Sequence, residues 1–403
     1  MKTSTLIILC LLLGLYSEPV LGAEFVLTDA AQGKDVGDWR ISNTELGIDT
    51  AFSVDQRVLH GGKQEGVRVI DIDTGAMQIT LVPTRGMDIK EVKSGDLVLG
   101  WSSPVKEIVN PAYIDLESRN GLGWLDGFNE MLVRCGYEWT GHPGEDHGYM
   151  LSLHGRAGNT PASNVLVIID DKAPHTIRIR GKIVEKTFKF SDYQIWTELE
   201  VTPGEKRFAI HDELTNLGDY TREYQIIYHS NFGRPLLEKG ALFLAAVKQI
   251  SPFNSYAVNG LDNWQTYLGP TKGYDEMVYN IVPYADASGN TVAVLHNAKG
   301  NMGVAVGFNI KQLPVLSLWK NTDTEKQGYV TGIEPGTSYA YNRKYQRDLG
   351  LVPTIEPGES KRFDLTYTLL DSSKAVLQAT KKVNALQDKQ PAEVDRTPPV
   401  KLP

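Results

Sequence analysis

Residues 176–214 contain three extended runs separated by short turn-forming clusters, and this pattern constrains the fold more than any other feature of the sequence. Apolar and polar residues alternate within the first run, as in Thr176-Ile177-Arg178-Ile179-Arg180. A period of two is typical of a strand with one face in the core and the other in solvent. Similar runs recur along most of the chain, whereas helical periodicity is scarce. The sequence therefore predicts an all-β protein of antiparallel strands.

The domain organisation follows from the absence of a linker. The chain has 403 residues, and no stretch rich in Pro, Gly or Ser divides residues 25–371. Length alone suggests two or three domains, but β-sandwiches often exceed 200 residues as one unit. We therefore expect a single large antiparallel β domain over 25–371. Short helices are expected near 125–132 and over 373–386, and residues 372–403 are expected to form a docked helix followed by a loose tail.

The first 22 residues are typical of a secretory signal peptide. Lys2 gives a positive start, residues 6–15 are almost uninterruptedly apolar, and small residues precede Ala23. The apolar run is about half as long as the roughly 20 residues that cross a bilayer. We therefore expect cleavage of residues 1–22, export to the periplasm or the medium, and no stable membrane insertion of the mature chain.

Charge and cysteine content argue against a nucleic-acid-binding protein and against an intrachain disulfide. The chain carries 41 Lys and Arg against 49 Asp and Glu, a net charge of −8, and no stretch concentrates the basic residues. Nucleic acid is therefore not an expected partner. Of two cysteines, Cys10 lies in the predicted signal peptide, which leaves Cys135 without an intrachain disulfide partner. We expect Cys135 to be a small buried apolar residue.

Three titratable residues stand in informative local contexts. His154 follows a strand-like run and precedes Gly155, which permits the close approach of a ligand or of another backbone. His229 ends the run 224–229 and is followed by polar residues and a turn. Glu334 lies at the end of another strand-like run, before a Pro-Gly pair. Each residue alone is more often structural than functional, so the inference depends on the three together.

Several motifs carry a resemblance over roughly residues 55–370. They are Pro83-Thr84-Arg85-Gly86-Met87-Asp88-Ile89, Gly100-Trp101-Ser102-Ser103-Pro104, Leu153-His154-Gly155-Arg156, Tyr228-His229-Ser230-Asn231-Phe232-Gly233-Arg234-Pro235 with Leu236-Leu237, Trp319-Lys320 and Glu334-Pro335. In this order the motifs resemble the aldose 1-epimerase (galactose mutarotase-like) superfamily. They are closest to a bacterial branch of it that has no assigned activity.

The resemblance implies a galactose mutarotase-like β supersandwich whose concave face holds a monosaccharide. It implies an isomerase that opens and recloses a sugar hemiacetal, with Glu334 as the base and His229 as the acid. His154 would hydrogen-bond the ring oxygen, and Arg85 would hold a sugar hydroxyl. A carboxylate and an imidazole suit these roles because the pKa values of both can be tuned towards 7. The chemistry requires neither a metal nor another cofactor.

Further substrate contacts are expected from Arg156, Asn231 and Trp319 in the same motifs. The family acid that contacts the sugar hydroxyls has no counterpart in these motifs, and we assign this role to Glu276 or its neighbour Asp275 in Gly273-Tyr274-Asp275-Glu276-Met277. Trp101 and Trp124 are further candidates for stacking on a sugar face. Arg156 replaces a glycine of the family pattern, and an additional arginine predicts an acidic, keto-modified or otherwise decorated sugar.

Other functions remain open from the sequence. The same acid and base could act as a lyase or isomerase on an oxidised sugar, a keto sugar or a uronide, by removing a proton next to a carbonyl. The chain could also bind carbohydrate without catalysis. Two histidines and a carboxylate also suit a metal ion. The expected partner in every reading except the last is a small carbohydrate, and the oligomeric state is open.

Overall fold

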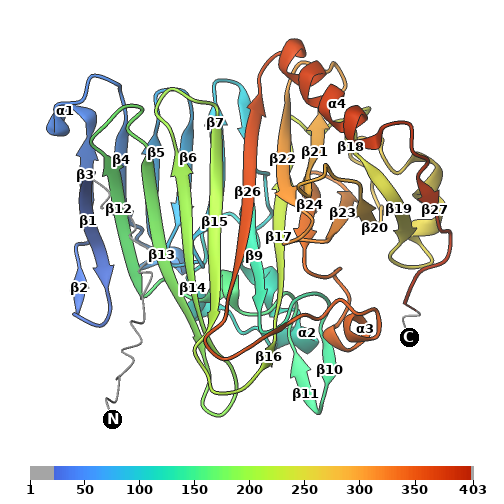
Figure 1. Cartoon of the computed structure of the whole chain (residues 1–403), viewed down its shortest axis with the longest axis horizontal. Helices are drawn as coiled ribbons and strands as arrows, with labels where there is room; N and C mark the ends of the chain where they lie inside the picture. Colours follow the sequence, from blue (N-terminus) through green and yellow to red (C-terminus); the bar gives the residue numbers. More distant parts are fainter. Residues whose placement is uncertain (1–21, 401–403) are drawn as a thin grey trace, which may run out of the picture.

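Two large antiparallel sheets pack face to face in the computed structural model, which describes residues 22–400 (Figure 1). In spatial order, the first sheet contains β18 (Leu242–Ala245), β21 (Asn290–His296), β22 (Gly303–Asn309), β26 (Ser360–Leu370), β15 (Arg207–Asn216), β14 (Asp192–Val201), β13 (Ile177–Lys186), β12 (Asn164–Asp170), β1 (Gly22–Asp29) and β2 (Lys34–Asp35). The predicted all-β class and supersandwich are confirmed. Of the predicted signal peptide, all but Gly22 lies outside the described residues.

The second sheet carries two of the three titratable residues singled out in the sequence, His229 and Glu334. In spatial order, it contains β27 (Glu393–Val394), β19 (Val247–Pro252), β20 (Met277–Pro283), β23 (Val315–Thr322), β24 (Tyr329–Gly336), β17 (Gln225–Phe232), β9 (Leu132–Tyr137), β7 (Asp88–Ser94), β6 (Gln78–Val82), β5 (Arg68–Asp73), β4 (Ser53–Val58) and β3 (Trp39–Ser42), with β8 (Leu97–Leu99) paired to β7. Two small sheets pair β10 (Gly144–Asp146) with β11 (Tyr149–Leu151), and β16 (Arg222–Glu223) with β25 (Thr354–Ile355).

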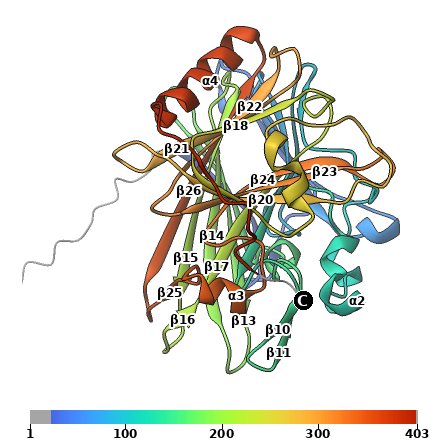
Figure 2. The ribbon, with the colours of Figure 1, turned by 90° about the vertical axis from the view of Figure 1, so that its right-hand side faces the viewer.

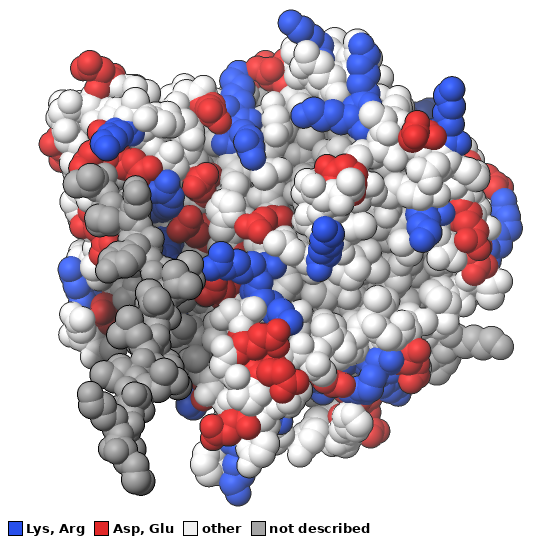
Figure 3. All heavy atoms as spheres, in the orientation of Figure 1, with Lys and Arg blue, Asp and Glu red and all other residues white. Residues whose placement is uncertain are grey.

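The three runs of residues 176–214 form the neighbouring strands β13, β14 and β15. Ile179 pairs with Leu199, and Leu199 pairs with Ile210, so their side chains share one face. These side chains are buried in the main core between the two sheets. The opposite face carries charged residues such as Arg180, which pairs with Glu198. Figure 3 shows positive and negative side chains interspersed over the face of the molecule that it presents.

Helices are short and lie at the edges of the sheets. They are α1 (Asn43–Leu46), α2 (Ser118–Gly121), α3 (Arg343–Asp348) and α4 (Ser373–Gln387). In α4, which matches the helix expected over 373–386, Val376, Ala379 and Val383 form the buried stripe that packs on the first sheet (Figure 2). Within residues 22–400, no helix has the length and apolar character needed to cross a bilayer.

The segment after α4 corrects the expectation of a loose tail. β27 pairs in parallel with β19, and Val400 is buried in the cluster on the outer face of the second sheet. Backbone pairing of β27, whose side chains are exposed, and burial of the single apolar residue Val400 dock this part of the chain. The sequence concealed both contacts, because neither depends on a periodic apolar pattern.

The helix expected near 125–132 is also wrong. Residues Gly123–Asp126 form a single 3-10 turn, and the chain is extended again from Leu132 in β9. Gly127 separates the two parts, and a Cβ atom there would collide with the guanidinium of Arg85. Successive apolar residues of this segment pack against different parts of the protein. Their spacing therefore resembles that of a helix, although no helix forms.

The central strands of the second sheet are buried on both faces. Every residue of β9, β17 and β24 is buried. One face of each strand packs into the core between the sheets, and the other face packs under a second apolar cluster that includes Trp124 and Phe128. Cys135 lies in this second cluster, which confirms the expectation that it is a buried apolar residue. The second cluster is the setting of the candidate site.

A buried ion pair joins the two sheets. Arg134 of β9 donates from Nε to Asp212 of β15 at 2.7 Å and from Nη2 at 3.1 Å. Tyr228 of β17 donates its hydroxyl to the same carboxylate at 2.8 Å. Arg134 also donates to the carbonyl of Met87, so the charges have several hydrogen-bond partners in the core.

We expect Arg134→Met to lower the free energy of unfolding by about 3–5 kcal/mol, because it leaves the Asp212 carboxylate buried without its cation. The double variant Arg134→Met/Asp212→Leu removes both charges and should recover most of the loss. Urea denaturation measures both effects. Arg362→Met is the matched control, because it breaks an exposed pair with Glu213 and should cost less than about 1 kcal/mol. A similarly small loss for Arg134→Met would contradict the role assigned to the pair.

Candidate active site

Strand register brings His229 and Glu334 together. β17 and β24 are antiparallel neighbours, and Ser230 pairs with Ile333, which sets His229 opposite Glu334. Tyr228 and Ile333 face the core between the sheets, so His229 and Glu334 project from the other face. Nε2 of His229 lies 3.3 Å from Oε1 of Glu334. Gly332 is required beside them, because a Cβ atom at this position would collide with the Glu334 carboxylate.

His154 joins the pair from a loop. Its ring meets the ring of His229 edge to face, with 5.3 Å between the centroids. His154 has a φ of 59°, a left-handed conformation that costs free energy in a residue other than glycine. The loop is held by hydrogen bonds from His154 N to the carbonyl of Gly141 and from Gly136 N to the carbonyl of His154. At Gly155 a Cβ atom would collide with the carbonyls of Gly136 and Trp139, so this glycine permits the close backbone approach that the sequence predicts.

The three residues line one pocket of about 140 Å³. Its other lining residues are Leu122, Trp124, Leu125, Phe128, His142, Leu153, Glu276, Val278, Trp319 and Ala340. Trp319 donates from Nε1 to Glu276 at 2.8 Å, which links an aromatic wall to a carboxylate. A volume equal to roughly five water molecules suits one small ligand rather than a chain of sugars.

Burial changes the protonation of all three residues. It raises the pKa of Glu334 well above its usual range, and the Glu276 carboxylate raises it further. Burial also lowers the pKa of His229 to about 4. The pKa of His154 is lowered well below its usual value by burial and then by the neighbouring His229 and His142. Desolvation thus favours the neutral form of each group.

Several buried polar atoms around the pocket have no hydrogen-bond partner among the described residues. They are Nδ1 of His154, Nδ1 of His229, Nε1 of Trp124 and Oε1 of Glu334, whose 3.3 Å contact with Nε2 of His229 lacks the geometry of a hydrogen bond. Buried polar groups in proteins are almost always paired, and an unpaired one costs about 1–3 kcal/mol. A ligand rich in hydroxyl groups would satisfy both donors and acceptors here. An apolar ligand would leave them unpaired.

Of the expected substrate-binding residues, Glu276 and Trp319 line this pocket and Asn231 does not. Asn231 is buried behind His229 and donates to the carbonyls of His229 and Glu130 at 3.1 Å each. Glu276 rather than Asp275 provides the carboxylate, since Asp275 accepts a hydrogen bond from the backbone N–H of Glu276 in its own loop. Of the other tryptophans considered, Trp124 lines the pocket and Trp101 does not.

Arg85 and Arg156 do not reach this pocket, which corrects two expectations. Arg85 is fully buried and pairs with Glu130 at 2.8 Å, behind the segment that lines the pocket. Arg156 lines a different cavity and pairs with Glu138 at 2.6 Å. In both cases the guanidinium pairs with a carboxylate that lies outside the local motif. The motif alone could not predict this pairing. The expectation of an acidic or keto-modified sugar, which was based on an arginine at the site, therefore loses its support.

His142 is a pocket residue that the sequence analysis missed. Its Nδ1 lies 2.7 Å from the carbonyl oxygen of Ala340, so Nδ1 carries the proton and Nε2 is free to accept a hydrogen bond. The ring also lies against Phe253, with 4.9 Å between centroids. The sequence offered one signal, the position of His142 between Gly141 and Pro143-Gly144. Among the described residues, no group of three His, Cys, Asp or Glu is arranged to hold a metal ion.

Comparison with known proteins identifies the family. A family model described as a domain of unknown function, DUF4432, matches residues 64–369. The chain belongs to this family. A crystal structure from Klebsiella pneumoniae, described as that of a candidate aldose 1-epimerase, is 54% identical, with a TM-score of 0.93 and coverage of 94% of this chain and 100% of the other. No match is found among curated proteins.

More distant structures share the fold of this DUF4432 protein. A galactose mutarotase-like protein from Clostridium acetobutylicum is 13% identical, with a TM-score of 0.54 over 83% of this chain and 99% of the other. A galactose 1-epimerase from Lactobacillus acidophilus is 12% identical, with a TM-score of 0.51 over 79% and 99%. The chain therefore has the galactose mutarotase-like fold, as the motifs indicated.

The raised pKa of Glu334 predicts a pH-dependent effect of Glu334→Gln on stability. The unfolded chain releases this proton near pH 4.5, whereas the folded DUF4432 protein keeps it to higher pH, so stability contributed by this group is lost as pH rises above 4.5. Glutamine is a neutral replacement of the same shape and avoids this loss. We therefore expect the variant to have a higher Tm than the wild type at pH 8 and a similar Tm at pH 5.

Thermal unfolding followed by circular dichroism measures this difference. Glu205→Gln is the matched control, because Glu205 is exposed in the turn between β14 and β15 and should give no pH-dependent gain. A Tm of Glu334→Gln below that of the wild type at pH 8 would show that Glu334 is ionised and stabilising in the folded chain, which is the opposite of the effect that burial should have on this carboxyl group.

Proposed function

We propose that this protein is a carbohydrate isomerase that opens and recloses the hemiacetal of a monosaccharide. The observation that carries the proposal is the contact of His229 Nε2 with Glu334 Oε1 at 3.3 Å inside a buried pocket. An acid and a base in contact are what hemiacetal opening needs. The similarity to proteins described as aldose 1-epimerases supports the same reaction class.

The reaction requires one proton to leave and one to arrive. A base removes the proton from the anomeric hydroxyl, the bond between C1 and the ring oxygen breaks, and an acid protonates the ring oxygen, which leaves an open aldehyde. The aldehyde carbon then rotates and the ring recloses on either face. We assign Glu334 as the base and His229 as the acid, with His154 donating a hydrogen bond to the ring oxygen.

Burial prepares the pair for this exchange. In water, histidine holds its proton about two pKa units more tightly than glutamate does. The pocket raises the pKa of Glu334 and lowers that of His229 to about 4, which reverses this preference and favours the proton on Glu334. The pair then holds one proton, which belongs to both groups as a coupled unit. For the assigned roles this proton passes from Glu334 to His229 across their 3.3 Å contact before the ring opens.

The walls of the pocket suit a sugar ring. Trp124, Phe128 and Trp319 provide aromatic surface for the C–H face of the ring. Glu276 and Nε2 of His142 are acceptors for hydroxyl groups at the rim. With about 140 Å³ available, we propose a neutral monosaccharide as the substrate.

We expect Glu334→Gln and His229→Asn each to lower kcat for mutarotation by about 10²–10⁴-fold, the contribution typical of general acid–base catalysis. Polarimetry and NMR exchange on a panel of aldoses measure the rate above that of buffer. Trp319→Phe keeps the wall but loses the hydrogen bond to Glu276, so it should raise KM more than it lowers kcat.

Three outcomes would contradict the proposal. The first is a wild type that accelerates no sugar of the panel and does not differ from Glu334→Gln. The second is the formation of an unsaturated or isomerised product from keto sugars or uronides, which would identify a lyase or a different isomerase. Sugar binding without turnover that survives both Glu334→Gln and His229→Asn would identify a binding protein.

A further inference from the structure

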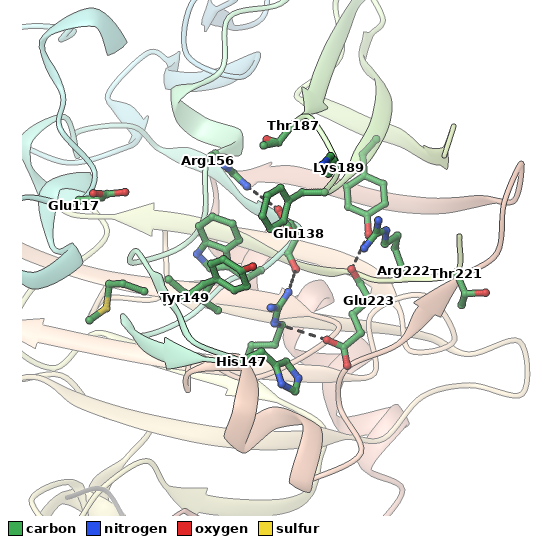
Figure 4. Close-up of a pocket in the computed structure, with 16 residues that line it drawn as sticks. Glu117, Glu138, His147, Tyr149, Arg156, Thr187, Lys189, Thr221, Arg222 and Glu223 are labelled. Atoms are coloured by element: carbon green, nitrogen blue, oxygen red, sulfur yellow. Dashed lines mark hydrogen bonds and ion pairs between the residues drawn. The ribbon is translucent and has the colours of Figure 1, made fainter. Parts of the chain in front are cut away.

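A second cavity of about 590 Å³ lies at the end of the molecule where the hairpin of β10 and β11 faces the loop between β13 and β14 (Figure 4). Its volume is about four times that of the acid–base pocket, and the two have no lining residue in common. It falls within the range of roughly 300–1,000 Å³ that is usual for small-molecule sites. Arg156, expected from the sequence to bind substrate, lines this cavity.

Four charged groups that line the cavity, Arg156, Glu138, Arg343 and Glu223, take part in ion pairs, whereas Glu117, Lys189 and Arg222 form none with the described residues. Arg156 contacts Glu138 at 2.6 Å and Glu185 at 3.4 Å. Arg343 contacts Asp146 at 2.7 Å and also donates to the carbonyl of Glu138. An ionic ligand would have to compete with these internal partners, so the paired floor does not favour an ion.

Donors and acceptors remain available in spite of this pairing. Arg156 uses Nε and Nη2 for its carboxylate partners, and a guanidinium carries five N–H groups in all. The Glu138 hydrogen bonds with Arg156 and Ser191 both use Oε2, and Oε1 accepts none from a described side chain. Thr187 and Thr221 add hydroxyl groups to the lining. The floor is therefore rich in hydrogen-bonding groups while most of its charges are paired.

Aromatic side chains complete the cavity. Tyr149 and Phe190 meet edge to face at 5.4 Å and connect the two hairpins, and both are exposed, at 56% and 42%. Trp139 forms a deeper wall, with the guanidinium of Arg156 stacked on its ring at 4.4 Å. Aromatic faces beside planar polar groups match a ligand that has apolar C–H faces and a belt of hydroxyl groups.

We propose that this cavity is a second carbohydrate-binding site, which takes a neutral di- or oligosaccharide. The lining carries four Lys and Arg against three Glu, a near balance that favours neither an anion nor a cation. The aromatic walls disfavour a fully polar ligand, and the volume exceeds that of one sugar ring. The site shares a wall with the acid–base pocket. Leu151 faces the larger cavity and Leu153 the smaller one, and Trp139 donates to the carbonyl of Ser152 between them.

Calorimetric titration of the Glu334→Gln chain with methyl glycosides of lactose, maltose and cellobiose tests this site. A methyl glycoside cannot open its ring, so turnover adds nothing to the signal, and Trp319→Ala reports any binding in the acid–base pocket. We expect one of these ligands to bind, and Tyr149→Ala and Arg156→Lys each to weaken its binding about tenfold or more. Phe188→Ala is the matched control and should retain binding, since Phe188 is 84% exposed in the same loop but does not line the cavity.

Three results would overturn the proposal. One is the absence of binding by every ligand of the panel at millimolar concentration. Another is binding that survives Tyr149→Ala and Arg156→Lys but is lost in Trp319→Ala, which would assign it to the acid–base pocket. The third is a change of oligomeric state in Tyr149→Ala or Phe190→Ala without any saccharide binding, which would identify a self-association surface. None of these results depends on isomerase activity, so this proposal and the proposed function can fail separately.

Discussion

The arrangement of the site depends on the hydrogen bonds that the Asp212 carboxylate accepts between the two sheets. Asp212 accepts hydrogen bonds from Arg134 of β9 and Tyr228 of β17. These bonds fix which side chains of the two strands point into the core. Because side chains alternate along a strand, Tyr228 facing inward requires His229 to face outward. A shift of register by one residue would bury the imidazole between the sheets and abolish the site.

The site also requires apolar side chains that pack over the outer face of the second sheet. Trp124 and Phe128 come from the long connection between β8 and β9, and Val400 comes from the end of the described chain. Trp124 and Phe128 lie against the ring of His229, and His229 and Glu334 are both nine-tenths or more buried. The same desolvation raises the pKa of Glu334 and lowers that of His229, and the proposed acid–base exchange rests on these two shifts. Burial by the fold is thus the main cause of both pKa shifts, and no unusual side chain is needed.

The sequence predicted the parts of this account that depend on local pattern. Alternation identified β13, β14 and β15, and the motifs around His154, His229 and Glu334 identified three side chains that meet in one pocket. It could not predict features that depend on distant partners. Arg85 and Arg156 resembled ligand-binding arginines, but Glu130 and Glu138 hold them elsewhere. His142 was missed because its orientation comes from a carbonyl nearly two hundred residues away, at Ala340. The spacing of apolar residues near 125–132 resembled that of a helix, because apolar residues that pack in an irregular segment can have the same spacing.

The central claim is that His229 and Glu334 share one proton in a dry pocket, and the pH dependence of kcat for mutarotation tests it most directly. The account predicts a rate that is unchanged from neutral pH down to about 5 and falls near pH 4, where His229 takes up a second proton and the pair loses its base. The uncatalysed rate at each pH is subtracted. A decline centred near 6.5, the ordinary value for a histidine in water, would contradict the account.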